Sequence, residues 1–330
     1  MRDPGGFLRA HGFAGAAVAP LAVDASFRRY LRLTGGPRPA LLMDAPPPFE
    51  DVRPFVRIGR YLAGRDLSAP AILAADEAAG FVLIEDFGDT SYAALLDAGA
   101  DPLPLYLEMA EALAALHAAP PALALPAWDA AAMARAGAAT FLDWWWPAAF
   151  GAPASDALRA EFAAAIGAML APFAGARRLV HRDYFPANLM RLPEREGARR
   201  VGLLDFQDAA LGHPAYDLVS LVEDARRDVA EPVRRAAIAR YLALRPELDA
   251  EEFAAAMAAC AAQRHLRVAA LWVRLARRDG KPGYLPHGPR CWALLARALA
   301  HPATAPLRDF LDAHVPPARR GNPQAVTEAA

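Results

Sequence analysis

The stretch LVHRDYFPANLM, residues 179–190, decides the fold of this chain together with VGLLDFQ at residues 201–207. Asp205 ends the apolar run of the second stretch, which predicts a buried strand, and a carboxylate there is costly unless a cation or hydrogen-bond donors compensate it. Asp183 and Asn188 lie five residues apart in the first stretch, with a proline between them. They are therefore predicted in a loop, where both side chains can turn toward one point.

The two stretches match, in order and spacing, the catalytic loop H-R-D-x-x-x-x-N and a later D-F-x. Either half alone would be a weak signal, because Asp and Asn in loops are more often turn formers. Together they predict phosphoryl transfer from ATP, in which protein groups position the reactants and neutralise charge. We predict that Asp183 is the catalytic base for the attacking hydroxyl and that Asn188 and Asp205 are ligands of Mg²⁺.

Length and composition limit the classes of protein. A chain of 330 residues exceeds what one hydrophobic core usually serves, so we expect two lobes. The 36 basic and 37 acidic residues nearly balance, which predicts no nucleic-acid partner. Cys260 and Cys291 are too few for a disulfide framework or a zinc site. The first 20 residues lack signal-peptide features and the uncharged stretches are too short for a bilayer, so we expect a cytoplasmic protein without a membrane partner.

The secondary-structure pattern changes along the chain. Strands are predicted at 17–23, 27–33, 40–44, 71–74 and 81–85, with one helix among them at 51–64. Further helices are predicted at 103–119, 130–146, 156–173, 229–244, 250–278 and 290–299. We therefore predict an N-terminal nucleotide-binding lobe at 1–88, a C-terminal catalytic and substrate lobe at 89–318, and a flexible tail at 319–330.

This layout resembles the aminoglycoside phosphotransferase and choline kinase-like families over most of the chain. The resemblance implies an α+β, bilobal protein-kinase-like fold with a small β-rich N-lobe and a larger, mainly helical C-lobe. It also implies that the adenine of ATP binds at the linker LIEDF, residues 83–87, through backbone groups of Glu85 and Phe87. From the residues alone, this stretch is equally compatible with a strand that simply leaves the small lobe.

Three supporting residues belong to the same region. The resemblance implies that Asp217 braces the catalytic loop, although on sequence alone it could be the N-cap of the next helix. His181 is expected to pack and to form hydrogen bonds, since Asp183 is better placed as the base. Arg182 stands where aminoglycoside kinases commonly have glycine. Asp217 follows Asp205 so closely that no long activation segment fits, so we expect no regulation by loop phosphorylation.

One departure from the wider kinase pattern concerns phosphate binding. The strand that usually supplies a phosphate-binding lysine has Met43 at that position, and the only lysine of the chain is Lys281. Ser26 with Arg28 or Arg29 can serve instead, because a hydroxyl, backbone N–H groups and a guanidinium all suit phosphate oxygens. Alternation along a strand allows only one of the two arginines to face the nucleotide, and we favour Arg28.

Within the superfamily the chain resembles most closely the anomeric kinases of N-acetylmuramate and N-acetylglucosamine, a family of cell-wall sugar recycling. The resemblance rests on DASFRRY at 24–30, LMDAP at 42–46, IEDFG at 84–88, LDFQD at 204–208, YDLVSL at 216–221, EDARRD at 223–228 and RRDGKP at 277–282. It implies ATP- and Mg²⁺-dependent phosphorylation of the C1 hydroxyl of an amino sugar. The candidate substrate residues are Tyr184, Glu223, Asp224 and Arg227, although each of the three charged side chains alone is more often a helix-surface charge.

Two alternatives stay open on the sequence. Another small-molecule kinase of the same fold could act on an aminoglycoside, choline or a similar alcohol, and a cationic acceptor would require an acidic pocket. A nucleotide-binding pseudokinase is a second alternative, because the usual lysine is replaced by Met43. The intact set of Asp183, Asn188 and Asp205 opposes that reading. A monomer is expected, without a specific signal.

Overall fold

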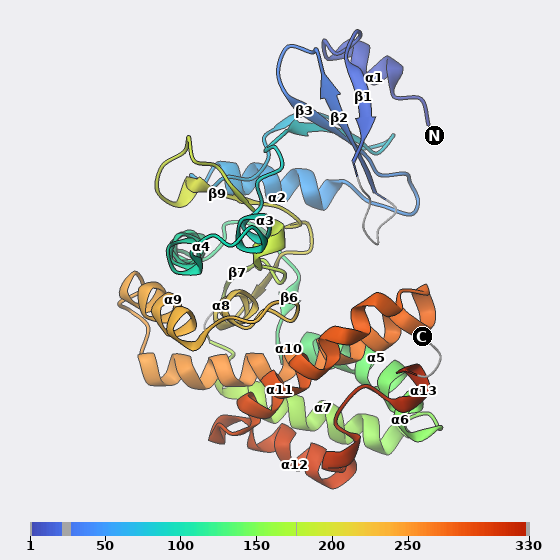
Figure 1. Cartoon of the computed structure of the whole chain (residues 1–330), viewed down its shortest axis with the longest axis vertical. Helices are drawn as coiled ribbons and strands as arrows, with labels where there is room; N and C mark the ends of the chain where they lie inside the picture. Colours follow the sequence, from blue (N-terminus) through green and yellow to red (C-terminus); the bar gives the residue numbers. More distant parts are fainter. Residues whose placement is uncertain (1, 22–27, 176, 328–330) are drawn as a thin grey trace. The chain divides into compact units, whose positions relative to one another are not determined.

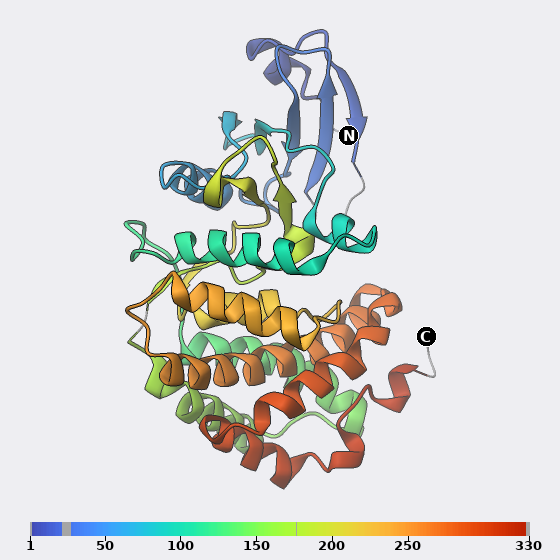
Figure 2. The ribbon, with the colours of Figure 1, turned by 60° about the vertical axis from the view of Figure 1, so that its left-hand side comes forward.

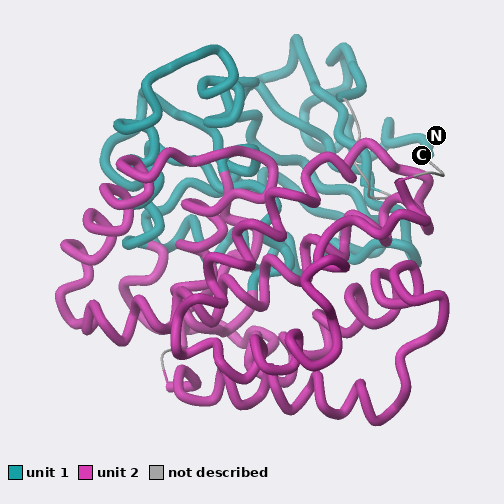
Figure 3. Tube along the Cα trace, turned by 60° about the horizontal axis from the view of Figure 1, so that its bottom comes forward, with its two compact units in different colours: residues 1–115, 186–209 teal, residues 116–185, 210–330 magenta. Residues whose placement is uncertain are grey.

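The computed structural model describes residues 2–21, 28–175 and 177–327. The chain divides into two compact units (Figure 3). Unit 1 comprises Met1–Ala115 and Pro186–Ala209, and unit 2 comprises Leu116–Phe185 and Ala210–Ala330. The chain therefore passes from unit 2 back into unit 1 just after the predicted base, Asp183, and leaves it again after Asp205.

Unit 1 contains a five-stranded antiparallel sheet in the order β1-β2-β3-β5-β4 (Figure 1). The strands are β1 (Ala17–Pro20), β2 (Arg29–Thr34), β3 (Ala40–Asp44), β4 (Ile72–Asp76) and β5 (Phe81–Glu85). Each of the five predicted strands is present, although residues 22–23 and 27 of the first two predicted ranges lie outside the described residues. Two helices accompany them, α1 (Gly5–Ala10) and the predicted α2 (Arg53–Ala63).

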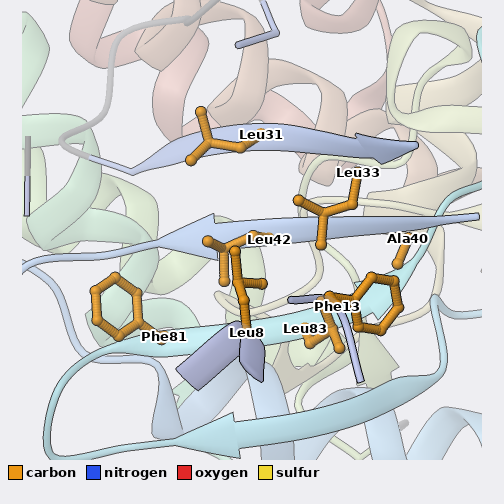
Figure 4. Packing of buried hydrophobic residues seen from close by; sticks show 8 residues of the cluster. All are labelled: Leu8, Phe13, Leu31, Leu33, Ala40, Leu42, Phe81 and Leu83. Atoms are coloured by element: carbon orange, nitrogen blue, oxygen red, sulfur yellow. The ribbon is translucent and has the colours of Figure 1, made fainter. Parts of the chain in front are cut away.

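Cross-strand pairing builds the core of this sheet. Leu31 pairs with Leu42, and Leu42 pairs with Leu83, so one row of leucines crosses three strands. Leu8 and Phe13, from the N-terminal segment, pack on this row and are buried with it (Figure 4). Because side chains alternate between the faces of a strand, the register of this row fixes which face every neighbour takes.

A second group of elements belongs to unit 1. These are α3 (Tyr92–Asp97), α4 (Pro102–Leu116) and the hairpin of β8 (Leu189–Arg191) with β9 (Val201–Leu203). The Glu108 carboxylate accepts hydrogen bonds from the Tyr92 hydroxyl at 2.9 Å and from the Arg191 guanidinium at 3.0 Å. The backbone N–H of Leu203 donates to the Ser68 carbonyl. These bonds place the hairpin and both helices with the sheet, which differs from the predicted boundary after residue 88.

Unit 2 is mainly helical around a small sheet. Its strands β6 (Ala127–Trp128), β7 (Arg178–Val180) and β10 (Ala210–Gly212) follow the order β6-β10-β7. Its helices are α5 (Ala130–Thr140), α6 (Trp146–Phe150), α7 (Asp156–Leu170), α8 (Ala215–Val222), α9 (Glu231–Ala243), α10 (Ala250–Asp279), α11 (Gly288–Leu299), α12 (Ala305–His314) and α13 (Gln324–Thr327).

Helix α10 is the central element of unit 2 and contacts α5, α7, α8 and α11 (Figure 2). It begins where the Asp249 side chain accepts the backbone N–H of Glu252, and it ends at Gly280, whose φ of 63° suits a residue without a Cβ. None of the helices in the described ranges has the length and hydropathy that a bilayer-spanning segment requires.

The region predicted as one helix at 130–146 is interrupted. Phe141–Trp145 forms a π-helical turn between α5 and α6. Trp145 is fully buried, and its indole N–H donates to the Gly321 carbonyl at 2.8 Å. Trp144 and Trp146 remain partly exposed, as expected for adjacent residues that cannot share one helix face.

The predicted flexible tail also differs from the structure through Thr327. The Gly321 carbonyl accepts the Trp145 indole N–H, and the Asn322 side chain donates to the Leu285 carbonyl at 2.7 Å. Val326 is only 3% exposed. The sequence signal was misleading because Gly, Pro and Ala at the end of a chain usually mark fraying, whereas here the contacts come from distant residues.

We expect Val326→Asp to destabilise unit 2 and Thr327→Asp to leave its stability nearly unchanged. The first change must either bury a carboxylate or detach α13, at a cost of about 2–3 kcal/mol, whereas the Thr327 side chain is exposed. Thermal and chemical denaturation of both variants measures the difference. Equal melting of the two variants would contradict the packing of α13.

Candidate active site

The first part of the predicted catalytic loop, with Asp183, lies in unit 2, and a buried carboxylate holds it. The Asp217 side chain accepts the backbone N–H of His181 at 2.6 Å and that of Arg182 at 2.8 Å. Arg182 has a φ of 75°, a left-handed conformation that costs an L-residue roughly 1–2 kcal/mol. The two hydrogen bonds to Asp217 offset this strain, and they fix the backbone directly before Asp183.

Asp217 lies in the first turn of α8, where Pro214 occupies the N-cap position. The N-cap alternative is therefore wrong. The same carboxylate lies 3.3 Å from Nε2 of His117, whose Nδ1 lies 2.9 Å from the Tyr241 hydroxyl. Burial lowers the pKa of His117, so a neutral ring connects these two partners.

Asp183 itself is partly open to solvent, with 40% of its side chain exposed. Desolvation raises the pKa of its carboxyl, but the positive charges of nearby arginines, Arg264 and Arg267 above all, outweigh that effect and lower it overall. The carboxylate is therefore ionised at neutral pH, which is the state that a general base requires.

The predicted metal ligands lie together in unit 1. The Asn188 side-chain amide is 3.4 Å from Oδ2 of Asp205, and the Leu204 N–H donates to the Asn188 carbonyl across the hairpin. Asp205 has a φ of 58°, a second left-handed residue in a predicted motif. Its other carboxylate oxygen accepts the Gln207 amide at 2.7 Å.

This donor set fits Mg²⁺. In the described ranges there is no group of three or more His, Cys, Asp or Glu side chains that could hold a metal ion. Mg²⁺ usually keeps several waters and is bound by one or two protein oxygens together with substrate phosphates. One carboxylate and one amide, Asp205 and Asn188, match that preference and do not match a closed structural site.

The predicted adenine-binding stretch is held from two sides in unit 1. The Arg195 guanidinium pairs with the Glu85 carboxylate and lies 5.1 Å from the Phe87 ring centroid. Arg32 donates to the Asp86 carboxylate at 2.7 Å. The Glu85 N–H donates to the Ala71 carbonyl, so this N–H is not available to a base.

The residues predicted to replace the missing lysine are only partly described. Ser26 lies outside the described residues. Arg28 is half-buried and pairs with Glu50 at 3.2 Å, whereas Arg29 is exposed. The two arginines thus differ in exposure, as alternation predicts. Met43 is fully buried in β3, so its side chain belongs to the hydrophobic core.

The candidate substrate residues occupy different environments in unit 2. The Glu223 carboxylate is buried and shared by His265, Arg234 and Arg297, which makes it an internal counter-ion. Tyr184 is also buried. This environment does not support a direct substrate role for either residue.

The other two candidates follow Glu223 in the chain. Asp224 is 5% exposed, and burial raises the pKa of its carboxyl. Its carboxylate accepts the Arg226 N–H at 2.9 Å. Arg227 is half-buried. Of the four candidates, only Arg227 is partly exposed, whereas Asp224 is as buried as Glu223.

Sequence reasoning missed three residues of these sites. Tyr30 lies close enough to Asp205 for the negative charge to add to burial in raising its pKa. Arg195 holds the predicted adenine-binding stretch and Arg264 holds the predicted catalytic loop, both by side-chain contacts across long sequence separations. A single arginine in an arginine-rich chain gives no signal for such a contact, whereas Tyr30 belongs to a stretch that the resemblance already marked.

Comparisons with known proteins identify the family of this chain and its relatives. The phosphotransferase enzyme family matches residues 17–253. The chain is 39% identical to the N-acetylmuramate/N-acetylglucosamine kinase of Caulobacter vibrioides, covering 94% of this chain and 95% of that one. It is 38% identical to the kinase of the same name from Pseudomonas aeruginosa, covering 90% and 88% of the two chains.

Solved structures show the same fold. A choline/ethanolamine kinase family protein from Mesorhizobium loti superposes with a TM-score of 0.62 at 13% identity, covering 90% of this chain and 94% of that one. The GDP complex of an aminoglycoside 2′-phosphotransferase gives a TM-score of 0.55 at 16% identity, covering 86% and 92%. The predicted protein-kinase-like α+β fold is thereby confirmed.

Asp217→Asn is expected to weaken the catalytic loop. An amide presents its NH₂ to one of the two backbone N–H groups, which leaves a buried donor unsatisfied and costs about 1–3 kcal/mol. We expect a lower free energy of unfolding, measured by chemical denaturation, together with slower turnover. Asp309→Asn is the control, because that side chain is 71% exposed. Equal stabilities of the two variants would contradict the bracing role.

Proposed function

We propose that this chain, which belongs to the phosphotransferase enzyme family, transfers the γ-phosphoryl group of ATP to the anomeric C1 hydroxyl of N-acetylmuramate or N-acetylglucosamine. The reaction would return cell-wall amino sugars to the pool of sugar phosphates, and it would take place in the cytoplasm, where ATP is available. The relatives of that name, which match nearly the whole chain at 38–39% identity, support the acceptor.

The observation that carries the proposed chemistry is the state of Asp183. Its carboxylate is ionised, partly exposed and attached to a backbone that Asp217 holds in a strained conformation. An ionised carboxylate on a rigid loop can accept the proton of a sugar hydroxyl as the oxygen attacks phosphorus.

Mg²⁺ would be held by Asp205 and Asn188. The ion supplies positive charge that neutralises phosphate oxygens during transfer. Tyr30 and Arg28 lie in the same unit, and Arg28 is the cationic side chain that we assign to the phosphates in place of a lysine. The linker residues Glu85 and Phe87 would bind the adenine through backbone groups.

The charges of unit 2 favour this acceptor over the alternatives. Asp224 is accompanied by Arg226, Arg227 and Arg264, all of which act on the pKa of its carboxyl. An acceptor such as choline or an aminoglycoside is cationic and would be repelled by an excess of guanidinium groups. A neutral sugar, or one that carries a lactate carboxylate, is compatible with them.

The acceptor is tested with purified protein, ATP, Mg²⁺ and four separate compounds: N-acetylmuramate, N-acetylglucosamine, choline and kanamycin. We expect ADP release with the amino sugars alone, and a loss of about 100-fold or more in Asp183→Asn, because that variant has no base. Turnover with only choline or kanamycin would overturn the acceptor. Tight ATP binding without any turnover would instead support a pseudokinase.

The metal assignment is tested by titrating Mg²⁺ at fixed ATP and sugar. Asp205→Asn is expected to need about tenfold more Mg²⁺ for half-maximal activity, because it loses the charged ligand. The matched control is Asp51→Asn in the same unit, since that exposed carboxylate pairs with Arg53. An unchanged Mg²⁺ requirement in Asp205→Asn would contradict the assignment.

A further inference from the structure

An arginine on α10 lies against the predicted catalytic loop. The Arg264 side chain is only 4% exposed, although it carries a full charge. Its Nη1 lies 3.1 Å from the Arg182 carbonyl, 3.5 Å from the Tyr216 hydroxyl and 3.9 Å from Oδ1 of Asp183. A buried guanidinium is costly unless it is paired and hydrogen-bonded, so these contacts account for its position.

The carbonyl of the strained Arg182 peptide requires a hydrogen-bond donor. Arg182 takes a left-handed φ, and Asp217 accepts the N–H groups on one side of the turn. The carbonyl of Arg182 accepts from Arg264. The Arg182 guanidinium itself lies 4.1 Å from the Trp128 ring centroid. The strained peptide is therefore held between the anion of Asp217 and the cation of Arg264.

The distance to Asp183 is also informative. At 3.9 Å, the guanidinium lies beyond hydrogen-bonding distance of the carboxylate, yet close enough for a strong Coulombic interaction in a partly desolvated site. Arg264 therefore stabilises the ionised base without a direct hydrogen bond to it. A bidentate pair at this position would occupy the oxygens that have to meet the acceptor hydroxyl.

Other charged groups face Asp183 as well. Arg267 lies on the same helix and donates to the Tyr216 hydroxyl at 3.2 Å, and His181 and Arg182 belong to the loop. Arg264 exerts the largest lowering effect among these four on the pKa of the Asp183 carboxyl. It is also the one that contacts both the strained peptide and the base.

We propose that Arg264 is a positioning residue for the transfer reaction, because it fixes the Arg182 peptide and stabilises the ionised carboxylate of Asp183. This inference rests on the proposed function, in which Asp183 is the base. Arg264 acts through Asp183 and is not assigned a contact with the sugar. Arg264 thus adds to the loop a contact from a helix, since it lies 82 positions after Arg182 in the chain.

Three variants separate the contributions of Arg264. Arg264→Met removes both the charge and the donor, Arg264→Gln keeps a donor without the charge, and Arg264→Lys keeps the charge. The control is Arg278→Met, since that side chain lies on the same helix, is 50% exposed and pairs with Asp279. The assay measures kcat and KM for N-acetylmuramate across pH, and thermal melts at each pH verify folding.

We expect Arg264→Met and Arg264→Gln to lower kcat about tenfold or more, with KM for the sugar changed much less. Loss of the nearby positive charge raises the pKa of Asp183, so the acidic limb of the kcat profile moves to higher pH. Arg264→Lys restores the position of that limb. If Arg264→Met does not fold, Arg264→Gln and Arg264→Lys decide the question.

Two results would overturn the inference: a wild-type kcat profile in Arg264→Gln, or a loss confined to KM for the sugar. A second readout needs no acceptor. Carboxyl ¹³C NMR, assigned with Asp183→Asn, follows the titration of Asp183 and should show a higher pKa in Arg264→Gln. Absence of wild-type turnover with either amino sugar contradicts the proposed function, whereas an unchanged carboxyl titration contradicts the role of Arg264.

Discussion

The conformation of the predicted catalytic loop depends on one carboxylate, that of Asp217. It is completely buried, and it accepts two consecutive backbone N–H groups from a segment that would otherwise not adopt a left-handed turn. A charge in such a place is stable only when donors surround it, and His117 adds one more contact. The direction in which Asp183 leaves the loop is therefore set by a residue that has no part in the chemistry.

In unit 1, other residues hold the predicted functional segments, also by side-chain contacts. One of its strained positions is Asp205, which lies two residues after the end of the buried strand β9. The linker that follows β5 is held by Arg195 on one side and Arg32 on the other. Strained backbone at non-glycine residues is concentrated at functional sites, and two of the three described cases in this chain fall in the two predicted motifs.

Much of this could be predicted from the sequence, for local reasons. Strands β3 and β5 and helix α10 follow from alternation, apolar runs and a capping box, which are short-range patterns. Asp183, Asn188 and Asp205 were predicted from the spacing of the two motifs alone. The family resemblance supplied what spacing could not, namely the bracing role of Asp217 and the acceptor.

The rest depends on contacts that sequence patterns do not carry. The sequence pattern alone favours a helix-surface position for Glu223, but its carboxylate is enclosed by His265 and two arginines. Arg264 could not be distinguished from the other arginines, because its role comes from the loop that it meets. The burial of Val326 was missed for the same reason, since its helix, α13, contacts α6 and α10, which lie far away in the sequence.

Phosphorylation at the anomeric carbon can be tested by NMR of the product. After incubation of N-acetylmuramate with ATP, Mg²⁺ and the protein, we expect a phosphorus signal coupled to the anomeric proton. Coupling of phosphorus to the protons on C6, or an unmodified anomeric centre, would contradict it.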